Sequence, residues 1–238
     1  MKTITPATTP AITTMLFLTV ATASLGQSSN IAADDKFAWG ENIGFTNWAD
    51  ANGRADGVRL ERSHLRGFVW GENVGWINNG SGPTDGLQYA NDATADKGVN
   101  VDTNGDLFGF AWGENIGWVN FDTRTSLTPF AQQARYDADA KRLRGYAWGE
   151  NVGWLNLDSA SVFVGVCFAD VTTTGTSSGV SDGVVDLSDF SFYLSQWAMS
   201  APDADITTPG VCNPGFGGDG VDLSDFSCYL SEWAQGCP

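Results

Sequence analysis

The nonapeptide Phe37-Ala-Trp-Gly-Glu-Asn-Ile-Gly-Phe45 decides the fold of most of the chain, because the motif occurs four times. It returns as Phe68-Val-Trp-Gly-Glu-Asn-Val-Gly-Trp76, Phe110-Ala-Trp-Gly-Glu-Asn-Ile-Gly-Trp118 and Tyr146-Ala-Trp-Gly-Glu-Asn-Val-Gly-Trp154. The first tryptophans of successive copies are 31, 42 and 36 residues apart, and length differences of this size belong in surface loops. Such a period indicates a repeat architecture in which neighbouring units bury a shared core.

Each copy of the motif has the composition of two short strands joined by a turn. Trp, Phe, Val and Ile favour strands, whereas Gly and Asn supply the positive φ angles of tight turns. A second strand pair is expected before each later copy, joining 57–60 with 65–67, 99–101 with 107–109 and 134–136 with 143–145. We expect a mainly β repeat domain over residues 33–165. It closes as a barrel-like, trefoil-like or propeller-like array, with N-terminal strands completing the last unit, or remains an open β-stack.

The repeated aromatic residues have two interpretations. In every copy the first tryptophan precedes a second aromatic residue by six positions, so both rings lie on one face if the turn keeps register. We favour a place in the core for these rings. The alternative is an exposed platform on which sugar rings stack. The residues concerned are Trp39, Trp70, Trp112 and Trp148.

The acidic residue of the motif also has a structural and a functional interpretation. We expect the asparagine to shape the turn and the glutamate to satisfy backbone amides or a neighbouring arginine, and the alternative places the glutamate in a ligand platform. Catalysis needs two carboxylates with different environments in one cleft, and four equivalent copies do not suggest this. We therefore expect no enzymatic activity, with a glycoside hydrolase as the remaining alternative. The glutamates are Glu41, Glu72, Glu114 and Glu150.

The N-terminus has the features of a secretory signal peptide. Lys2 precedes an apolar stretch over 11–20, and small residues follow at Ala21-Thr-Ala23. We expect a signal peptide over residues 1–26. Its apolar stretch is too short for a stable membrane anchor, so we expect a secreted or cell-surface bacterial protein without a transmembrane anchor.

Charge and cysteine content agree with export. The formal net charge is −16, and no Lys or Arg follows Cys167, so nucleic acid is a poor partner and calcium or a basic partner a good one. Four cysteines, all in the C-terminal part, favour disulfides, because His64 is the only histidine and zinc needs closer ligands. Of the three possible pairings we favour Cys167 with Cys237 and Cys212 with Cys228. His64 itself is expected in a solvated loop.

The C-terminal part contains a second duplication. Asp182-Gly-Val-Val-Asp-Leu-Ser-Asp-Phe-Ser returns from Asp219 as Asp-Gly-Val-Asp-Leu-Ser-Asp-Phe-Ser, one residue shorter. Asp and Gly at this spacing suggest a calcium loop that leads into a helix. The expected ligands are Asp170, Asp182, the Val184 carbonyl, Asp186 and Asp189 in the first copy, and Asp205, Asp219, Asp222 and Asp225 in the second.

A helix is expected after each loop. Ser188 and Asp189 have positions suited to an N-cap and a first-turn acid, and Ser224 and Asp225 repeat them. One apolar face per helix follows from the three- and four-residue spacing, and the two faces are expected to pack as a pseudo-twofold pair. These faces are Phe190, Tyr193, Leu194 and Trp197, and Phe226, Tyr229, Leu230 and Trp233.

Residues 167–238 resemble the GC-type dockerin-like domain of secreted bacterial proteins, a relative of type I dockerins. The duplicated Asp-Gly-Val-(Val)-Asp-Leu-Ser-Asp-Phe-Ser signature and the terminal Gly236-Cys-Pro238 carry the resemblance. It implies two calcium-loop and helix repeats, and a cohesin-type protein or a cell-surface sorting partner. The repeated motifs before Cys167 are similar to repeats in other secreted bacterial proteins.

The expected function is therefore that of an exported, non-enzymatic modular protein. Its dockerin-like tail binds calcium and docks or anchors the β-repeat domain outside the cytoplasm. The alternative is a carbohydrate-binding or polysaccharide-degrading component of an extracellular assembly. An exposed row of tryptophan rings would favour the alternative, and a buried row would favour the first interpretation.

Overall fold

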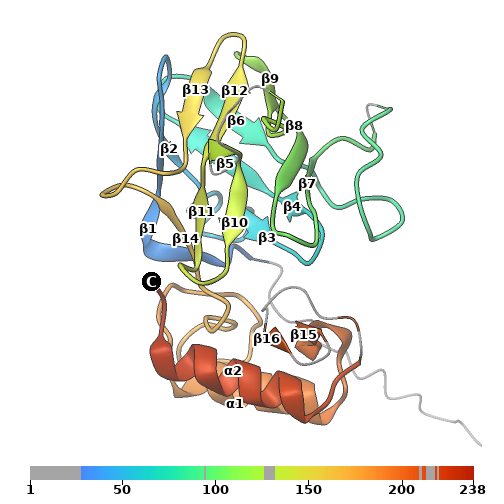
Figure 1. Cartoon of the computed structure of the whole chain (residues 1–238). Coiled ribbons are helices and arrows are strands. Elements are labelled where there is room, and N and C mark those ends of the chain that lie inside the picture. The colour runs from blue at the N-terminus through green and yellow to red at the C-terminus, as the bar shows by residue number, and fades with distance from the viewer. Residues whose placement is uncertain (1–27, 94, 126–131, 209–210, 213–217, 219) are drawn as a thin grey trace, which may run out of the picture.

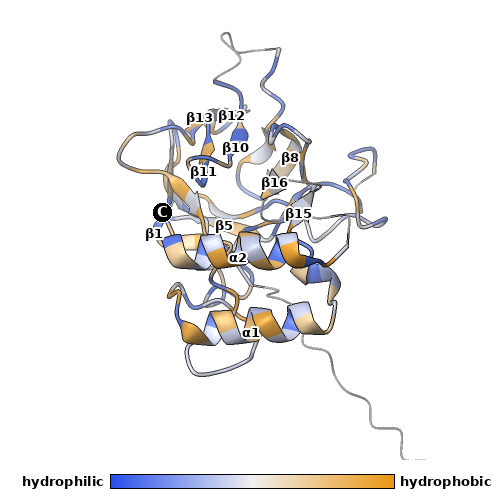
Figure 2. Ribbon diagram, turned by 60° about the horizontal axis from the view of Figure 1, so that its bottom comes forward, coloured by the Kyte–Doolittle hydropathy of each residue, from blue (hydrophilic) through white to orange (hydrophobic). Residues whose placement is uncertain are grey.

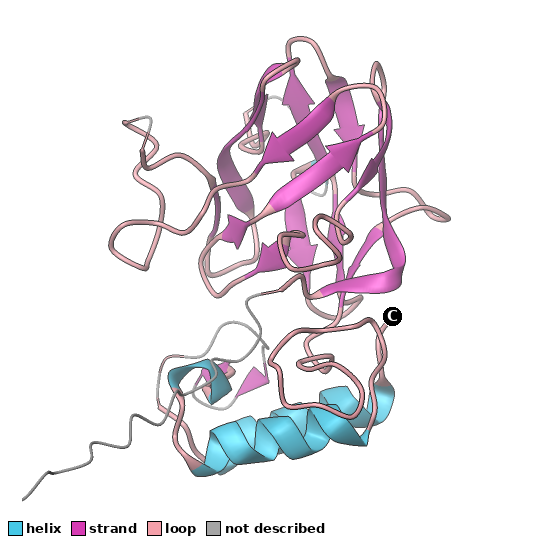
Figure 3. Ribbon diagram, turned by 180° about the vertical axis from the view of Figure 1, so that it is seen from behind, coloured by secondary structure: helices cyan, strands magenta, loops and turns pink. Residues whose placement is uncertain are grey.

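The computed structural model describes residues 28–93, 95–125, 132–208, 211–212, 218 and 220–238 (Figure 1). A β-barrel lies above a pair of helices in this view, and Figure 3 shows the same two parts from behind. The expected signal peptide over residues 1–26 lies outside the described residues.

Eight strands form a closed antiparallel barrel in the order β1-β13-β12-β9-β8-β6-β5-β2, and β2 returns to β1. The four copies of the motif are the four hairpins of this barrel, and its closure replaces the trefoil, propeller and open-stack alternatives. As expected, N-terminal strand β1 completes the last unit, because it pairs with β13. The strands are β1 (Ile31–Gly40), β2 (Gly44–Asn47), β5 (Phe68–Gly71), β6 (Gly75–Asn78), β8 (Leu107–Gly113), β9 (Gly117–Asn120), β12 (Tyr146–Gly149) and β13 (Gly153–Asn156).

Short strands at the lower end of the barrel confirm the expected second pairs. They are β3 (Arg59–Leu60) with β4 (Leu65–Arg66), β7 (Val99–Val101) with β8, and β10 (Arg135–Asp137) with β11 (Arg142–Arg144), while β14 (Val164–Val166) joins β11 to β1. A glycine with positive φ precedes each later motif, at Gly67, Gly109 and Gly145. A Cβ atom at any of the three would clash with a backbone carbonyl oxygen, so this crossing of strands requires glycine.

The geometry of the hairpin loops explains why two glycines and an apolar residue recur in every copy of the motif. Gly40 and Gly44 pair across the first hairpin, and three residues lie between them. Gly44 has a φ of 75°, the left-handed conformation that commonly ends a three-residue loop. The apolar loop residue folds back over the first glycine, since a Cβ at Gly113 would lie 2.7 Å from Ile116 Cγ1. Ile43, Val74, Ile116 and Val152 are all buried in this way at the upper end of the barrel.

Small and branched side chains fill the barrel. Ala38, Val69, Ala111 and Ala147 point inward from the first strands, and Thr46, Ile77, Val119 and Leu155 point inward from the second strands. Trp48 and Phe121 pack edge to face and are fully buried, with ring centroids 6.4 Å apart. A cavity of about 10 Å³ lies among these residues, so the barrel is a packed core and not a channel.

The C-terminal part is built on a pseudo-twofold pair of helices, α1 (Leu187–Ala198) and α2 (Leu223–Gln235), linked by η2 (Pro202–Ala204), β15 (Thr207–Thr208) and β16 (Val211–Cys212). Tyr193 and Tyr229 stack with ring centroids 3.7 Å apart. Trp197 Nε1 donates to the Asp222 carbonyl at 2.6 Å, and Trp233 Nε1 donates to the Asp186 carbonyl at 2.7 Å. The reciprocal bonds confirm the expected pairing of two equivalent faces.

Two details of the helices differ from the sequence expectation. The N-caps are Asp186 and Asp222 and not the serines that follow, because each aspartate accepts from the amide two residues on and forms a capping box. Leu194 and Leu230 are exposed, since the stacked tyrosines and the partly buried tryptophans already fill the space between the helices.

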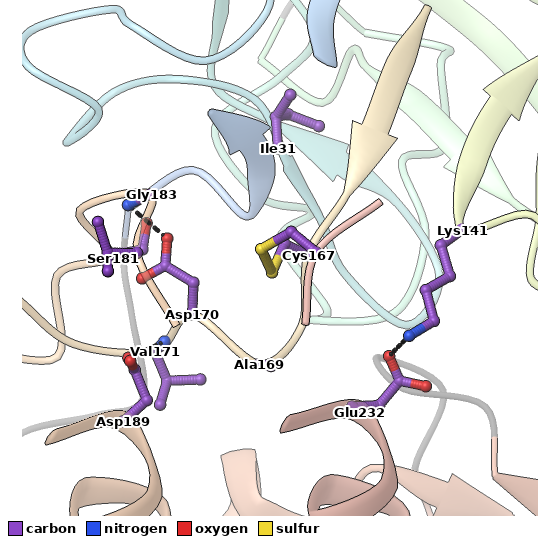
Figure 4. Close-up of a disulfide and its surroundings, with 12 residues drawn as sticks. Ile31, Lys141, Cys167, Ala169, Asp170, Val171, Ser181, Gly183, Asp189 and Glu232 are labelled. Carbon is purple, nitrogen blue, oxygen red and sulfur yellow. Dashed lines mark hydrogen bonds and ion pairs between the residues drawn. A yellow bond between two sulfur atoms is a disulfide. The ribbon is translucent and has the colours of Figure 1, made fainter. Parts of the chain in front are cut away.

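Polar contacts join the two parts of the chain, and both disulfides lie within the C-terminal part. Cys167 is bonded to Cys237 and Cys212 to Cys228, in agreement with the favoured pairing. Figure 4 shows the first bond near the ion pair of Lys141 Nζ with Glu232 Oε2, which is 2.8 Å long. Disulfides of this kind are typical of proteins in oxidising compartments.

Candidate ligand-binding surface on the outside of the barrel

The tryptophans of the motif lie on the outer surface of the barrel, and the expectation that they form the core is wrong. Trp39, Trp70, Trp112 and Trp148 are 45%, 40%, 41% and 43% exposed. Their neighbours at the alternate strand positions are buried. An eight-stranded barrel has a narrow interior that holds Ala, Val and Leu side chains, so strand alternation directs the larger rings outward.

Three rings cluster on the outer face of each hairpin. In the second hairpin the Trp70 and Trp76 ring centroids are 4.6 Å apart, and those of Phe68 and Trp76 are 6.2 Å apart. Such edge-to-face contacts hold the rings in place while leaving them open to solvent. The four clusters together form the aromatic belt, defined as Phe37, Trp39 and Phe45, Phe68, Trp70 and Trp76, Phe110, Trp112 and Trp118, and Tyr146, Trp148 and Trp154.

Strand register places an asparagine beside each tryptophan of the belt. Asn47 on β2 lies opposite Trp70 on β5, and the other hairpin junctions repeat this pair. The repeated pairs are Asn78 with Trp112, Asn120 with Trp148 and Asn156 with Trp39. These asparagines end the second strand of each hairpin and accept backbone amides two residues further on. No role was expected for them from the motif, although an asparagine follows the second aromatic residue of every copy by two positions.

The loop residues close the upper end of the barrel. Asn73 Nδ2 donates to the Ile43 carbonyl of the preceding hairpin at 3.0 Å, and Asn115 and Asn151 make the equivalent bonds. The asparagine therefore links neighbouring turns. Glu41 accepts from Trp154 N at 3.3 Å, which matches the expected structural role. Glu72, Glu114 and Glu150 are exposed and form no ion pair with any described residue.

Two hollows flank the second hairpin. One, of about 490 Å³, is lined by Phe37, Phe45, Asn47, Trp70, Glu72 and Val162. The other, of about 210 Å³, is lined by Ala51, Asn52, Asp56, Phe68 and Trp76. Each hollow combines aromatic walls with an exposed carboxylate, so this hairpin offers a stacking surface with polar groups on both sides.

The expected calcium ligands of the first loop anchor the backbone. Asp170 accepts from Asp182 N at 3.1 Å and Gly183 N at 2.6 Å (Figure 4), and Asp189 accepts from Val171 N at 2.8 Å. Burial raises the pKa of Asp170 to about 7, although the Gly183 amide and the Arg54 guanidinium lower it. Burial also raises the pKa of Asp189, against the hydrogen bonds from backbone amides.

The other aspartates expected to bind calcium, among the described residues, also accept hydrogen bonds from backbone amides. Asp225 accepts from Ile206 N and Thr207 N at 2.8 Å, and Asp205 accepts from Gly218 N at 2.9 Å. Asp182 accepts from Thr174 N and Val184 N, while Asp186 and Asp222 cap the helices. Asp219 lies outside the described residues.

The donor chemistry of these loops suits calcium, which prefers carboxylate and carbonyl oxygens. Within the described residues, however, no three His, Cys, Asp or Glu side chains gather closely enough to hold a metal ion. Each carboxylate that orders a loop does so by accepting backbone amides. Calcium binding therefore remains a prediction.

His64 is buried, and its expected place in a solvated loop is wrong. Its ring packs edge to face on Tyr89, with centroids 5.4 Å apart, and Ser63 Oγ lies 3.4 Å from its Nδ1. Burial lowers the pKa of His64 below its ordinary value, although the charge of Glu61 acts the other way. The segment between β4 and β7 places the Tyr89 ring over His64. This contact is distant in sequence, so the residues around His64 do not predict its burial.

Comparison with protein-family models, with curated proteins and with solved structures finds no match to this chain. In the described part of the chain, neither helix has the length and apolar character needed to cross a bilayer. The fold and the surface together define a class: a closed antiparallel barrel with an outward aromatic belt, followed by a two-helix domain that contains two disulfides.

Proposed function

We propose that the protein is an exported, non-enzymatic polysaccharide-binding protein that binds its ligand on the aromatic belt. The outward position of the motif tryptophans is the observation that carries this proposal. A buried row of rings would have favoured a purely structural role for the repeats.

The chemistry of the belt suits sugar rings. Each cluster presents aromatic faces on which the apolar side of a pyranose can stack, and stacking on preordered rings costs little conformational entropy. Glutamate carboxylates beside the rings accept hydrogen bonds from hydroxyl groups. In the hollow of Trp70 and Phe45, Glu72 supplies such an acceptor.

Repetition of the cluster suits a polymer. Four equivalent clusters around one barrel allow several sugar units, or several chains, to bind at once. Weak single contacts then add up through effective concentration. The proposal therefore places the ligand among extended polysaccharides and not among single sugars.

Pull-down on a panel of insoluble polysaccharides tests the proposal. We expect the full chain to be retained by at least one of them, and Trp70→Ala/Trp112→Ala to lose about tenfold in affinity, because two stacking faces are removed. The matched control is Leu187→Ala on the far helix, which should bind normally. Retention that is equal in all three proteins would contradict a role for the belt.

The C-terminal domain supports a second candidate function, docking or anchoring. Leu187 and Leu223 begin the two helices and are 68% and 71% exposed, and the exposed Leu194 and Leu230 lie two turns further along the same face of each helix. Figure 2 shows hydrophobic residues on the visible side of both helices. Two equivalent apolar patches related by pseudo-twofold symmetry suit a protein partner, and the dockerin-like resemblance points to a cohesin-type protein or a cell-surface sorting partner.

The proposal also includes an exported location and calcium binding by the C-terminal domain. The disulfides and the signal-like N-terminus support a secreted or cell-surface location, with the tail holding the barrel there. If calcium orders the loops, calorimetric titration of the full chain will show saturable binding that Asp182→Ala/Asp189→Ala abolishes. Absence of heat and of thermal stabilisation by calcium would leave the tail as an anchor ordered by aspartate–amide bonds alone.

A further inference from the structure

We propose that the cluster of Phe68, Trp70 and Trp76 on the second hairpin binds the ammonium group of a cationic amino-sugar polymer. This inference rests on the proposed polysaccharide function and names the class of sugar. Lysine ammonium groups of the protein already lie against two equivalent clusters, and carboxylates border this one.

The protein's own lysines lie against two of the other clusters. Lys97 Nζ lies 5.8 Å from the Phe110 ring centroid and 5.5 Å from that of Trp118. Lys36 Nζ lies 5.8 Å from the centroid of Phe37. Aromatic faces attract ammonium groups, and tryptophan does so most strongly. Two lysines in one molecule thus mark the belt as a surface that accepts this group.

The second hairpin has the same rings without such a cation. Among the described residues, no lysine or arginine lies over Phe68, Trp70 or Trp76. The rings are 36%, 40% and 48% exposed, so a ligand can reach them from solvent. This cluster is therefore free to take an ammonium group from outside the chain.

A carboxylate borders the cluster on each side. Glu72 lines the hollow beside Trp70, and Asp56 lines the hollow beside Trp76. Neither forms an ion pair within the described residues; Asp56 Oδ2 accepts from Asn52 Nδ2 at 2.9 Å. Two unpaired carboxylates beside open aromatic faces favour a positive ligand, and the net charge of −16 acts in the same direction at longer range.

These features distinguish between kinds of polysaccharide. A free amino sugar carries an ammonium group that can lie over Trp70 or Trp76 while Glu72 or Asp56 balances its charge. An acetylated amino sugar or a neutral glucan can stack but lacks this charge, and an acidic polysaccharide is repelled. The site therefore fits a polymer with free amino groups.

Calorimetry with two oligosaccharides of equal length tests the inference on the full chain. We expect a glucosamine oligomer to bind at least about tenfold more tightly than the N-acetylglucosamine oligomer, with affinity falling as salt is added. Glu72→Gln/Asp56→Asn should remove about tenfold of that preference. Asp139→Asn, in the turn between β10 and β11 and outside both hollows, is the matched control and should retain it. Lys97→Ala uncovers the third cluster and should increase the number of oligomers bound.

The outcomes separate this inference from the proposed function. Equal affinity for both oligomers, lost in Trp70→Ala, would overturn the ammonium site and leave polysaccharide binding intact. Preference for the amine that survives in Glu72→Gln/Asp56→Asn would also overturn the site. Failure of both oligomers and of every polysaccharide on the panel would overturn both proposals.

Discussion

Trp70 and Trp76 face each other across β5 and β6 with ring centroids 4.6 Å apart, and both rings lie on the outside of the barrel. The residues next to them on the same strands, Val69 and Ile77, are buried in the interior. The hairpin therefore separates two tasks: inward residues build the core, and outward rings are available for binding.

This separation predicts that an inward and an outward substitution in one hairpin lower the free energy of unfolding by different amounts. Ile116 is buried at the closed end of the barrel, so Ile116→Ala should lower the free energy of unfolding by about 2–4 kcal/mol. Trp112 is 41% exposed, so Trp112→Ala should cost about 1 kcal/mol, mainly through its contact with Trp118. Urea denaturation measures both values. Comparable losses would show that the belt is part of the core.

Each stacked tyrosine of the helical pair also makes one buried hydrogen bond. Tyr229 Oη donates to the Ala169 carbonyl at 2.9 Å, and Tyr193 Oη donates to the Ala204 carbonyl at 3.0 Å. Tyr229→Phe should destabilise the protein by about 1–2 kcal/mol, because a buried carbonyl loses its donor while the ring stack is kept. Thermal melting of Tyr229→Phe and Tyr193→Phe should give similar losses, and a clear inequality would argue against their equivalence.

The two disulfides should differ in their contribution to stability. Cys167–Cys237 closes a separation of 70 residues and Cys212–Cys228 one of 16. Loop-closure entropy then gives about 4 kcal/mol for the first bond and about 3 kcal/mol for the second. Paired Cys→Ser variants, unfolded in urea, check this order. A larger loss from the shorter loop would show that packing, and not chain entropy, dominates.

His64 gives the stability a pH dependence. Its pKa is lowered in the folded protein by burial, so the unfolded chain binds the proton more readily. Stability should therefore be fully present above the ordinary histidine pKa of about 6.5 and be lost as the pH falls through the folded value. Urea midpoints of wild type and His64→Gln between about pH 8 and pH 5 check the sign. Parallel profiles of the two proteins would exclude the histidine as the cause.

Much of the fold follows from local pattern. Gly-Glu-Asn turns, the second strand pairs and the helix spacing were all derivable, since each depends on neighbours in sequence. The disulfide pairing was one of three possibilities, because Cys167 and Cys237 are 70 residues apart. Barrel closure was one of four alternatives, because it depends on how β13 meets β1 across more than a hundred residues.

The side on which the tryptophans lie was not derivable from hydrophobicity alone. Large aromatic residues usually belong to the core, and only the narrow interior of an eight-stranded barrel forces them outward. The small alanines at 38, 111 and 147 were the overlooked signal, because alternation of alanine with tryptophan matches an interior with little room. The long-range burial of His64 by Tyr89 had no comparable local signal.

Tryptophan fluorescence quenched by acrylamide, with and without bound polysaccharide, tests the central claim most directly. The outward belt predicts strong quenching in the free protein and marked protection when a polysaccharide from the binding panel saturates it. Trp70→Ala/Trp112→Ala should show weaker quenching in the free protein and weaker protection by the polysaccharide. Weak quenching of the free protein, or binding that leaves quenching unchanged, would contradict the belt as the ligand surface.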